Sequence, residues 1–150
     1  MPETIHYQHA RFSTALPANY LYTDGHFWLH EIEKNVWRIG LTQYATRMLG
    51  EMVEFRIDLH PGDPVQLGQE IGSIEGFKAI AGLYSVMTGI FVEANPAAQK
   101  SAEIIDQNPY DDGWLYTLRG TPEKSEGTMD VHAYITLLEK TFAQRACLLR

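Results

Sequence analysis

One lysine in the sequence has the surroundings expected of an attachment site, because it lies within Glu75-Gly76-Phe77-Lys78-Ala79. A β-prone segment at residues 71–75 precedes this pentapeptide and another at residues 83–87 follows it, which predicts a strand–turn–strand unit. A lysine at the tip of such a unit holds its amine in water, where a modifying enzyme can enclose it. A group attached there can also reach other proteins. For the pentapeptide alone, an ordinary solvated lysine in a turn remains the alternative.

Other residues that could bind a metal or react form weaker patterns. His26 and His30 are four residues apart on a predicted strand, which would place half of a metal site on one face, without a third ligand. The run 111–113, Asp-Asp-Gly, lacks the spacing of a calcium loop and predicts a turn. Cys147 is the only cysteine, so an internal disulfide and a thiolate cluster for metal are both excluded. The sequence has no nucleophile elbow, P-loop or dinucleotide fingerprint.

Length and charge narrow the class of protein further. The chain has 150 residues, enough for one domain, with 45% hydrophobic and 21% charged residues. A formal charge of −7 argues against nucleic-acid binding and fits docking on basic partner surfaces. No apolar run is long enough to cross a bilayer, and residues 1–19 have no signal-peptide pattern. We therefore expect a cytoplasmic protein that contacts no membrane.

The chain divides into three parts. Residues 1–19 are polar and unpatterned, which predicts an N-terminal arm that drapes or stays mobile. Residues 20–119 contain short β-prone runs separated by Gly and Pro, which predicts a β core. Within the core, Thr42 is expected to cap a short helix that ends at Gly50, and Asn95-Pro96 is expected to start another.

Residues 128–148 are expected to form a C-terminal helix capped by Thr128. Its apolar residues recur at spacings of three or four and form one stripe: Val131, Ile135, Leu138, Phe142, Ala146 and Leu149. Cys147 lies on this stripe and is expected to be buried. Three tryptophans are expected to fill the core: Trp28, Trp37 and Trp114. The predicted fold class is mainly β (α+β), with two packed sheets, short helices and a C-terminal helix.

Several short motifs follow one another between residues 25 and 118: His26-Phe27-Trp28, Ile39-Gly40-Leu41-Thr42, Leu49-Gly50-Glu51-Met52-Val53, the pentapeptide around Lys78, Leu83-Tyr84-Ser85, residues 88–95 and residues 108–115. In their order and spacing, these motifs resemble H proteins of the glycine cleavage system. The resemblance implies a lipoyl-type barrel-sandwich hybrid with lipoic acid in amide linkage to Lys78. It also implies a carrier that is not an enzyme, and recognition of Glu75 by a lipoate ligase or lipoyl-assembly enzymes.

The chain departs from the family pattern where the loaded arm is sheltered. Gly25-His26-Phe27-Trp28 stands where the family has Ser-His-Glu-Trp, Tyr44 replaces a histidine, and Gly82 replaces an aspartate. In the family these groups face an aminomethyl cargo, which is cationic, and an unpaired buried charge is unfavourable. We therefore expect an arm-sheltering cleft, formed by Gly25, His26, Phe27, Tyr44 and Gly82, that suits a cargo without an ammonium group.

These departures lead to two expectations for the cargo. The pentapeptide and the long last helix resemble the lipoate-binding proteins of the heterodisulfide-reductase-like sulfur-oxidation system. That resemblance implies sulfur intermediates on the arm and a heterodisulfide-reductase-like complex as partner. The alternative is a diverged H protein that carries the aminomethyl group between glycine decarboxylase, aminomethyltransferase and dihydrolipoamide dehydrogenase.

Two further classes remain open on the sequence. A biotin carrier of related fold is disfavoured, because the neighbours of Lys78 are Phe77 and Ala79 rather than the methionines usual in biotin acceptors. An unmodified β-scaffold that acts as a binding module is the other alternative.

Overall fold

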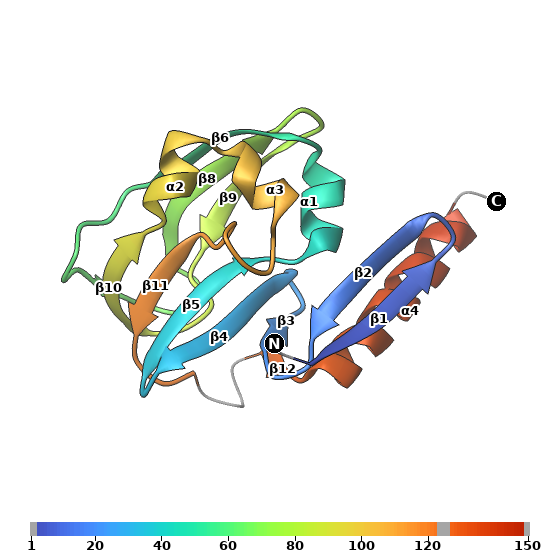
Figure 1. The fold of residues 1–150 in the computed structure, drawn as a ribbon, viewed down its shortest axis with the longest axis horizontal. Helices are drawn as coiled ribbons and strands as arrows, with labels where there is room; N and C mark the ends of the chain where they lie inside the picture. The colour runs from blue at the N-terminus through green and yellow to red at the C-terminus, as the bar shows by residue number, and fades with distance from the viewer. Residues whose placement is uncertain (1–2, 123–126, 149–150) are drawn as a thin grey trace.

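The structure, a computed structural model, describes residues 3–122 and 127–148, the last three of these as backbone only (Figure 1). The strands are β1 (Thr4–His9), β2 (Phe12–Pro17), β3 (Leu21–Thr23), β4 (Phe27–Glu33), β5 (Val36–Leu41), β6 (Met52–Ile57), β7 (Pro64–Val65), β8 (Glu70–Gly76), β9 (Ile80–Tyr84), β10 (Gly89–Ala94), β11 (Tyr116–Arg119) and β12 (Thr128–Met129). The helices are α1 (Gln43–Leu49), α2 (Pro96–Lys100), α3 (Glu103–Gln107) and α4 (Val131–Leu148).

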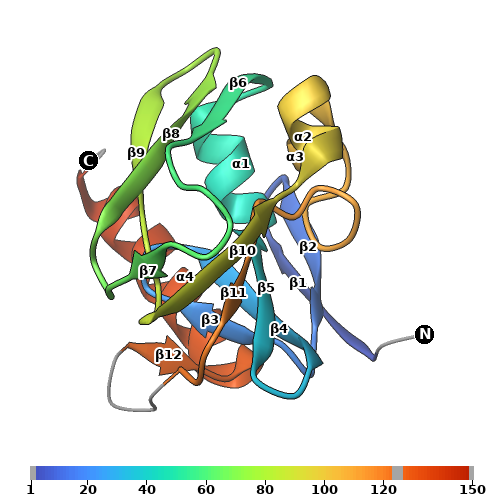
Figure 2. The same ribbon diagram turned by 90° about the vertical axis from the view of Figure 1, so that its left-hand side faces the viewer.

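Two sheets form the β core. The larger has seven strands in the order β12-β3-β4-β5-β11-β10-β7, and the smaller has three in the order β6-β8-β9. Figure 2 shows the smaller sheet facing the strongly curved larger one, with α1 closing one end between them. The strand pairs within both sheets are antiparallel. This confirms the predicted fold class.

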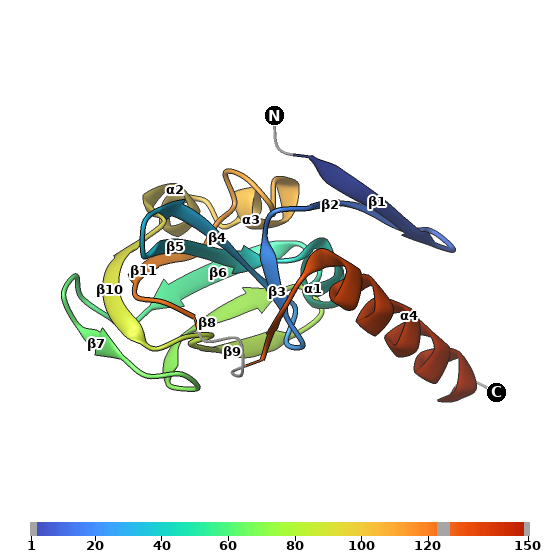
Figure 3. The same ribbon diagram turned by 90° about the horizontal axis from the view of Figure 1, so that it is seen from below.

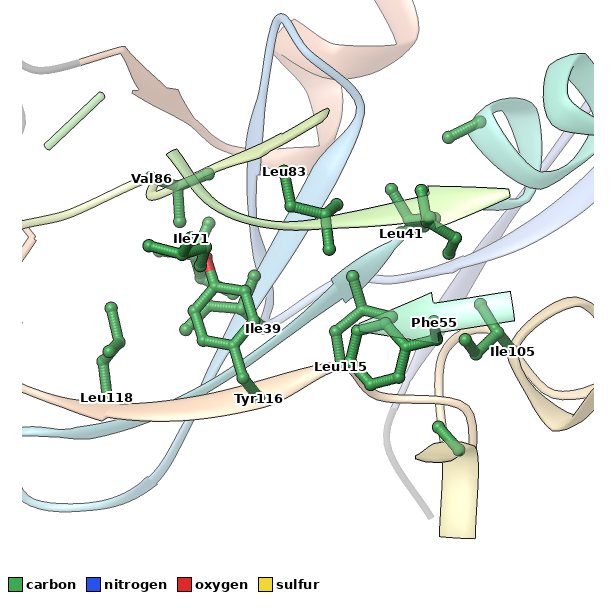
Figure 4. Close-up of a cluster of buried hydrophobic side chains, with 14 of the residues drawn as sticks. Ile39, Leu41, Phe55, Ile71, Leu83, Val86, Ile105, Leu115, Tyr116 and Leu118 are labelled. Carbon is green, nitrogen blue, oxygen red and sulfur yellow. The ribbon is translucent and has the colours of Figure 1, made fainter. Parts of the chain in front are cut away.

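The main hydrophobic core lies between the two sheets. Figure 4 shows Ile39 of β5 and Tyr116 of β11 on one side, facing Ile71 of β8 and Leu83 of β9 on the other. All four side chains are at most 1% exposed. Because residues alternate between the faces of a strand, the outer face of the smaller sheet is left to polar and exposed side chains.

The N-terminal residues, for which the sequence suggested an arm that drapes or stays mobile, form a paired β-hairpin. Strands β1 and β2 pair in an antiparallel register from Thr4 with Pro17 to His9 with Phe12. Alternate residues of β2 are buried, and one of them is the polar Thr14. Its hydroxyl lies 2.7 Å from the hydroxyl of Tyr110, which gives the buried threonine a partner. Figure 3 shows the hairpin and α4 extending from the same end of the β core, next to α1.

Helix α4 forms as predicted but begins three residues later than expected. Thr128 pairs with Thr23 in β12, and the carboxylate of Asp130 caps the helix by accepting the N–H of Ala133 at 2.8 Å. Of the predicted stripe, Val131 and Leu138 are fully buried, while Ile135 and Phe142 are only partly buried. Tyr134, which was not predicted to be buried, is 0% exposed. The predictions for Ala146, Cys147 and Leu149 fall outside the described side chains.

The other helices agree with their sequence signals where a capping residue is present. Thr42 accepts the N–H of Ala45 and Gly50 ends α1 with φ of 83°, as predicted. Asn95 caps α2, with Pro96 in its first turn. Helix α3 was not predicted, and its N-cap, Ala102, makes no side-chain hydrogen bond. Within residues 3–122 and 127–148, no helix has the length and apolar character needed to cross a membrane.

The prediction that all three tryptophans fill the core was right for Trp28 alone. Trp28 is 1% exposed, and its indole N–H donates to the Pro109 carbonyl at 2.8 Å. Trp37 and Trp114 are half-buried. Trp114 lies under the guanidinium of Arg38, 4.3 Å from the ring centroid, so it shields a cation rather than filling the core.

The docking of α4 can be tested at Leu138, which is 0% exposed in the second hydrophobic cluster. Leu138→Ala removes buried methyl groups and leaves a cavity, so we expect a loss of about 2–5 kcal/mol in the free energy of unfolding. Urea denaturation measures the loss. Lys140→Ala, at an exposed position of the same helix, is the control and should change stability by about 0.5 kcal/mol or less. Equal losses in the two variants would contradict the observed docking.

Candidate functional site

The β8–β9 turn places Lys78 at an exposed tip, as the sequence predicted. The turn closes through the N–H of Gly76, which donates to the Ala79 carbonyl at 2.9 Å. Two further backbone bonds tie the tip to the end of α1: Lys78 N–H donates to Leu49 O at 2.9 Å, and Phe77 N–H donates to Glu51 O at 3.0 Å. The backbone of the tip is therefore held in place while the side chains of Phe77 and Lys78 are exposed.

Two glycines allow the tip and the helix end to approach this closely. A Cβ on Gly76 would lie 2.1 Å from the Leu49 carbonyl oxygen, which accepts the bond from Lys78. Gly50 has a φ of 83°, a conformation that residues with a side chain rarely adopt. The sequence Glu-Gly-Phe-Lys thus needs its glycine for contact with α1 rather than for the turn itself.

The amine of Lys78 lies beside the last turn of α1. Its Nζ donates to the carbonyl of Arg47 at 3.3 Å. Lys78 contributes to the walls of two neighbouring cavities that share Arg47 as well. The first, about 480 Å³, includes two carboxylates, Glu51 and Asp106. The second, about 430 Å³, is called the hairpin cleft below; besides Lys78 it is lined by His9, Tyr44, Arg47, Met48, Phe142 and Arg145.

The five residues predicted for the arm-sheltering cleft line a single cavity of about 210 Å³. They are Gly25, His26, Phe27, Tyr44 and Gly82. The other residues in its wall are all apolar: Leu41, Ala45, Met48, Leu49, Ile74, Ala81 and Leu83. Since no charged side chain lines this cavity among the described residues, it offers no carboxylate to a cationic cargo.

Lys78 does not itself line the arm-sheltering cleft. Residues Tyr44 and Met48 of α1 contribute to the walls of both the arm-sheltering cleft and the hairpin cleft. The cleft that Lys78 lines and the arm-sheltering cleft therefore share part of their walls.

His26 is held in a strained backbone conformation, with φ of 68°. Its Nδ1 lies 2.8 Å from the hydroxyl of Tyr134, which in turn lies 2.8 Å from the hydroxyl of Thr42. Burial lowers the pKa of His26 from its ordinary value, an effect that the nearby carboxylate of Asp24 opposes. His26 is therefore a neutral imidazole near pH 7, positioned by a tyrosine of α4.

The remaining predicted residues have simpler surroundings. Glu75 lies in β8, three residues before Lys78. It is half-buried and pairs with Ile80 of β9. The sequence pattern had implied that His26 and His30 share one face of a strand. His26 instead lies in a turn before β4, so the two do not share a strand face. His30 instead stacks on Tyr20 at 4.5 Å. No group of three potential metal-ligating side chains occurs in the part of the chain that the structure describes.

Sequence reasoning missed Arg47, Tyr134 and Arg145. Arg145 is 101 residues from Tyr44, yet its Nη1 donates to the Tyr44 hydroxyl at 3.3 Å and to Met48 Sδ at 2.9 Å. Tyr134 is 108 residues from His26. No local pattern brings such residues together. Arg47 could have been predicted, because it is a basic residue in the last turn of a helix whose cap the sequence shows. Such a residue lies close to the segments that contact the end of the helix.

Two packed β-sheets with an exposed lysine at the tip of an anchored hairpin define the class of lipoyl-type carrier domains. The profile of the family described as glycine cleavage H-protein matches residues 20–141 of the chain. Over 124 residues, the chain is 36% identical to a glycine cleavage system H protein from Synechococcus sp. and 38% identical to one from Nitratidesulfovibrio vulgaris. These alignments span 82% and 81% of the chain, and 95% of each relative.

A solved structure gives the same result. The crystal structure of a glycine cleavage system H protein from Mycobacterium marinum superposes with a TM-score of 0.71 at 27% identity, covering 79% of this chain and 95% of that one. The chain belongs to the glycine cleavage H-protein family. Members of this family are lipoyl carrier subunits without catalytic activity, in agreement with the prediction that the chain is not an enzyme.

The contact between Gly76 and α1 can be tested by Gly76→Ala. The new methyl group would overlap the Leu49 carbonyl, so the tip or the helix end must move. We expect a loss of about 1–3 kcal/mol in the free energy of unfolding. Gly25→Ala is the matched control, because its Cβ would meet only ordinary contacts at 3.7 Å or more. Amide hydrogen exchange of Lys78 should accelerate in the first variant alone, and unchanged exchange there would refute the predicted displacement.

The lowered pKa of His26 predicts a pH dependence of stability. An unfolded histidine takes up a proton near pH 6.5, before the folded one does. The free energy of unfolding should therefore fall as the pH falls from about 7 through 6.5 towards the lowered pKa of the folded state. His26→Asn removes this component and tolerates the positive φ. The stability of the variant minus that of the parent should rise from pH 7 to pH 5 in urea titrations; a constant difference would contradict the burial of a neutral imidazole.

Proposed function

We propose that the chain is a lipoyl carrier in which Lys78 bears the lipoyl group. The observation that supports this is the position of Lys78: its backbone is anchored on α1 while its side chain is exposed at a hairpin tip. An acceptor lysine must enter the active site of a modifying enzyme without unfolding its own domain. A tip fixed by backbone hydrogen bonds meets that requirement, and it also gives the attached group a defined starting point.

Glu75 is proposed to be recognised by the lipoate ligase or lipoyl-assembly enzyme. It lies on β8 at the start of the turn, half-buried, with its carboxylate on the same unit as the acceptor lysine. A charged residue fixed in a strand can orient the turn on an enzyme surface. It does not react with the lipoyl donor, so its loss should slow modification rather than abolish it.

Lipoylation can be tested by mass spectrometry after incubation with a lipoate ligase, lipoate and ATP. Lys78→Arg keeps the charge but removes the nucleophilic amine, so the variant should gain no lipoyl mass. Lys34→Arg is the matched control, because Lys34 is an exposed lysine in the β4–β5 turn, and this variant should be modified fully. Glu75→Gln should be modified several-fold more slowly. Lipoyl mass on the Lys78→Arg protein would place the attachment site elsewhere, and biotinyl mass on the parent protein as isolated, before the incubation, would exclude a lipoyl carrier.

For the cargo, the first candidate is the aminomethyl group of glycine cleavage. Family membership and the names of the relatives support it. In this function the arm would be loaded by glycine decarboxylase and would then pass to aminomethyltransferase and dihydrolipoamide dehydrogenase.

A second candidate is a sulfur intermediate, delivered to a heterodisulfide-reductase-like complex. One observation favours it: the arm-sheltering cleft has no charged side chain in its wall, and Phe27 and Tyr44 give it an aromatic lining. Contact with an aromatic face stabilises a cation by only about 0.5–1 kcal/mol at exposed sites. A hydrogen bond to a charged group contributes about 1.5–3 kcal/mol. The cleft is thus a weaker shelter for an ammonium group than one that contains carboxylates.

The two candidates differ in the exchange of labelled bicarbonate with the carboxyl carbon of glycine, catalysed by glycine decarboxylase. For the lipoylated chain we expect exchange about tenfold or more below that of an H protein with an acidic cleft, since about 1.4 kcal/mol is a factor of ten. Phe27→Glu with Gly82→Asp should raise it. A Cβ on Gly82 would lie 3.2 Å from the side chain of Tyr84, which must move slightly and has room to do so because it is 51% exposed. Exchange equal to that of an ordinary H protein would assign the aminomethyl cargo and dismiss the sulfur candidate.

A further inference from the structure

Part of the wall of the hairpin cleft comes from segments of the chain that lie outside the family match. The match covers residues 20–141, whereas His9 precedes it and Phe142 and Arg145 follow it. Alignments with the two relatives cover 95% of their length but only 81–82% of this chain. The hairpin β1–β2 and the C-terminal half of α4 therefore complete a second cleft, of about 430 Å³, next to the lysine. The other residues of its wall, Tyr44, Arg47, Met48 and Lys78, lie within the match.

The charges of this cleft have one sign. Arg47, Lys78 and Arg145 line it, and among the described residues no carboxylate does. The ion pairs found in the described part of the chain, Arg56 with Asp58 and His60 with Asp63, lie elsewhere. A cationic cavity in a chain with a formal charge of −7 is a local exception, which the overall composition does not explain.

Neighbouring side chains orient both guanidinium groups. Arg47 lies over the ring of Phe12, 5.4 Å from its centroid, and Arg145 donates to the hydroxyl of Tyr44. Such contacts reduce the side-chain freedom that would be lost on binding. A guanidinium has five N–H groups and matches oxyanions in geometry, so each retains donors for a ligand.

Modification of Lys78 would leave this arrangement in place. Conversion of the amine to an amide removes one positive charge but keeps one N–H, so the contact with the Arg47 carbonyl can persist. The two arginines are then the cations beside the base of the arm. The other part of the wall, Tyr44, Met48 and Phe142, suits the hydrocarbon and sulfur of a lipoyl chain.

We infer that the hairpin cleft binds an oxyanion, either as the anionic end of a group carried by the arm or as a free small molecule. The inference rests on the proposed lipoyl arm only for the first of these sources. The inference extends the proposed carrier function by naming the class of ligand, which is negatively charged. An aminomethyl group, which is cationic, does not belong to that class.

The cleft is tested first with inorganic sulfate and the unmodified protein at low ionic strength, followed by NMR of the arginine side chains. We expect saturable binding that Arg47→Gln and Arg145→Gln each weaken about tenfold or more. Arg119→Gln, an exposed arginine of β11, should leave binding unchanged. Lys78→Gln, which is neutral like the lipoyl amide, should retain most of it. No saturable binding, equal weakening by Arg119→Gln, or loss with Lys78→Gln alone would overturn the inference.

The source of the oxyanion is tested with the lipoylated Cys147→Ser protein, which lacks the chain's own thiol. The reduced arm is alkylated with iodoacetate, which adds carboxylates, or with iodoacetamide, which adds neutral amides of similar size. An arm-borne source predicts that the carboxylated arm alone shifts the Arg47 and Arg145 signals and competes with sulfate. Equal signals in both forms, with sulfate still bound, assign the cleft to a free anion. Because the sulfate experiment uses unmodified protein, failed lipoylation of Lys78 would leave its result intact.

Discussion

Two backbone hydrogen bonds between the β8–β9 tip and the end of α1 determine the geometry of everything around the lysine. Lys78 N–H and Phe77 N–H donate to Leu49 and Glu51, which lie on either side of the glycine that ends the helix. For these bonds to form, α1 must end at Gly50 with a positive φ, and Gly76 must have no side chain. Lys78, the proposed attachment residue, is thus fixed relative to a helix of the core rather than to its hairpin alone. A side chain that swings from such a base starts from one position.

Helix α1 also explains why two chemically different clefts lie close to one lysine. Tyr44 and Met48 are four residues apart, so they stack along the helix and contribute to both cavities. On one side the wall is apolar and aromatic, and on the other Arg47 and Arg145 add positive charge. If Lys78 bears a group, as proposed, a neutral, apolar group would lose little in the first cleft, and an anionic one would gain contacts in the second. Among the residues whose side chains are described, neither wall contains a carboxylate that would retain an ammonium group.

Local sequence signals predicted the elements whose own residues mark their boundaries. Thr42 and Gly50 delimit α1, Asn95 and Pro96 start α2, and the apolar runs on both sides of Lys78 give the hairpin. The N-terminal hairpin was missed because one of its inward residues is Thr14, whose partner is Tyr110, 96 residues away. Helix α3 was missed because it has no capping side chain that would mark its start in the sequence. The start of α4 was misplaced because Thr128 and Asp130 are both good capping residues. Thr128 pairs with Thr23 in a strand instead, and Asp130 caps the helix.

The site itself needed contacts that no local pattern contains, and these converge on the first turn of α1. The Tyr110 hydroxyl accepts the N–H of Gln43 at 3.0 Å and contacts Thr14 of the hairpin. The Tyr134 hydroxyl, from α4, contacts Thr42. The hairpin and α4 are thus attached to the start of the helix, while the lysine tip is attached to its end. Seven residues of helix span only about 10 Å, so the contacts that hold the hairpin and α4 lie about that distance from those that hold the lysine tip.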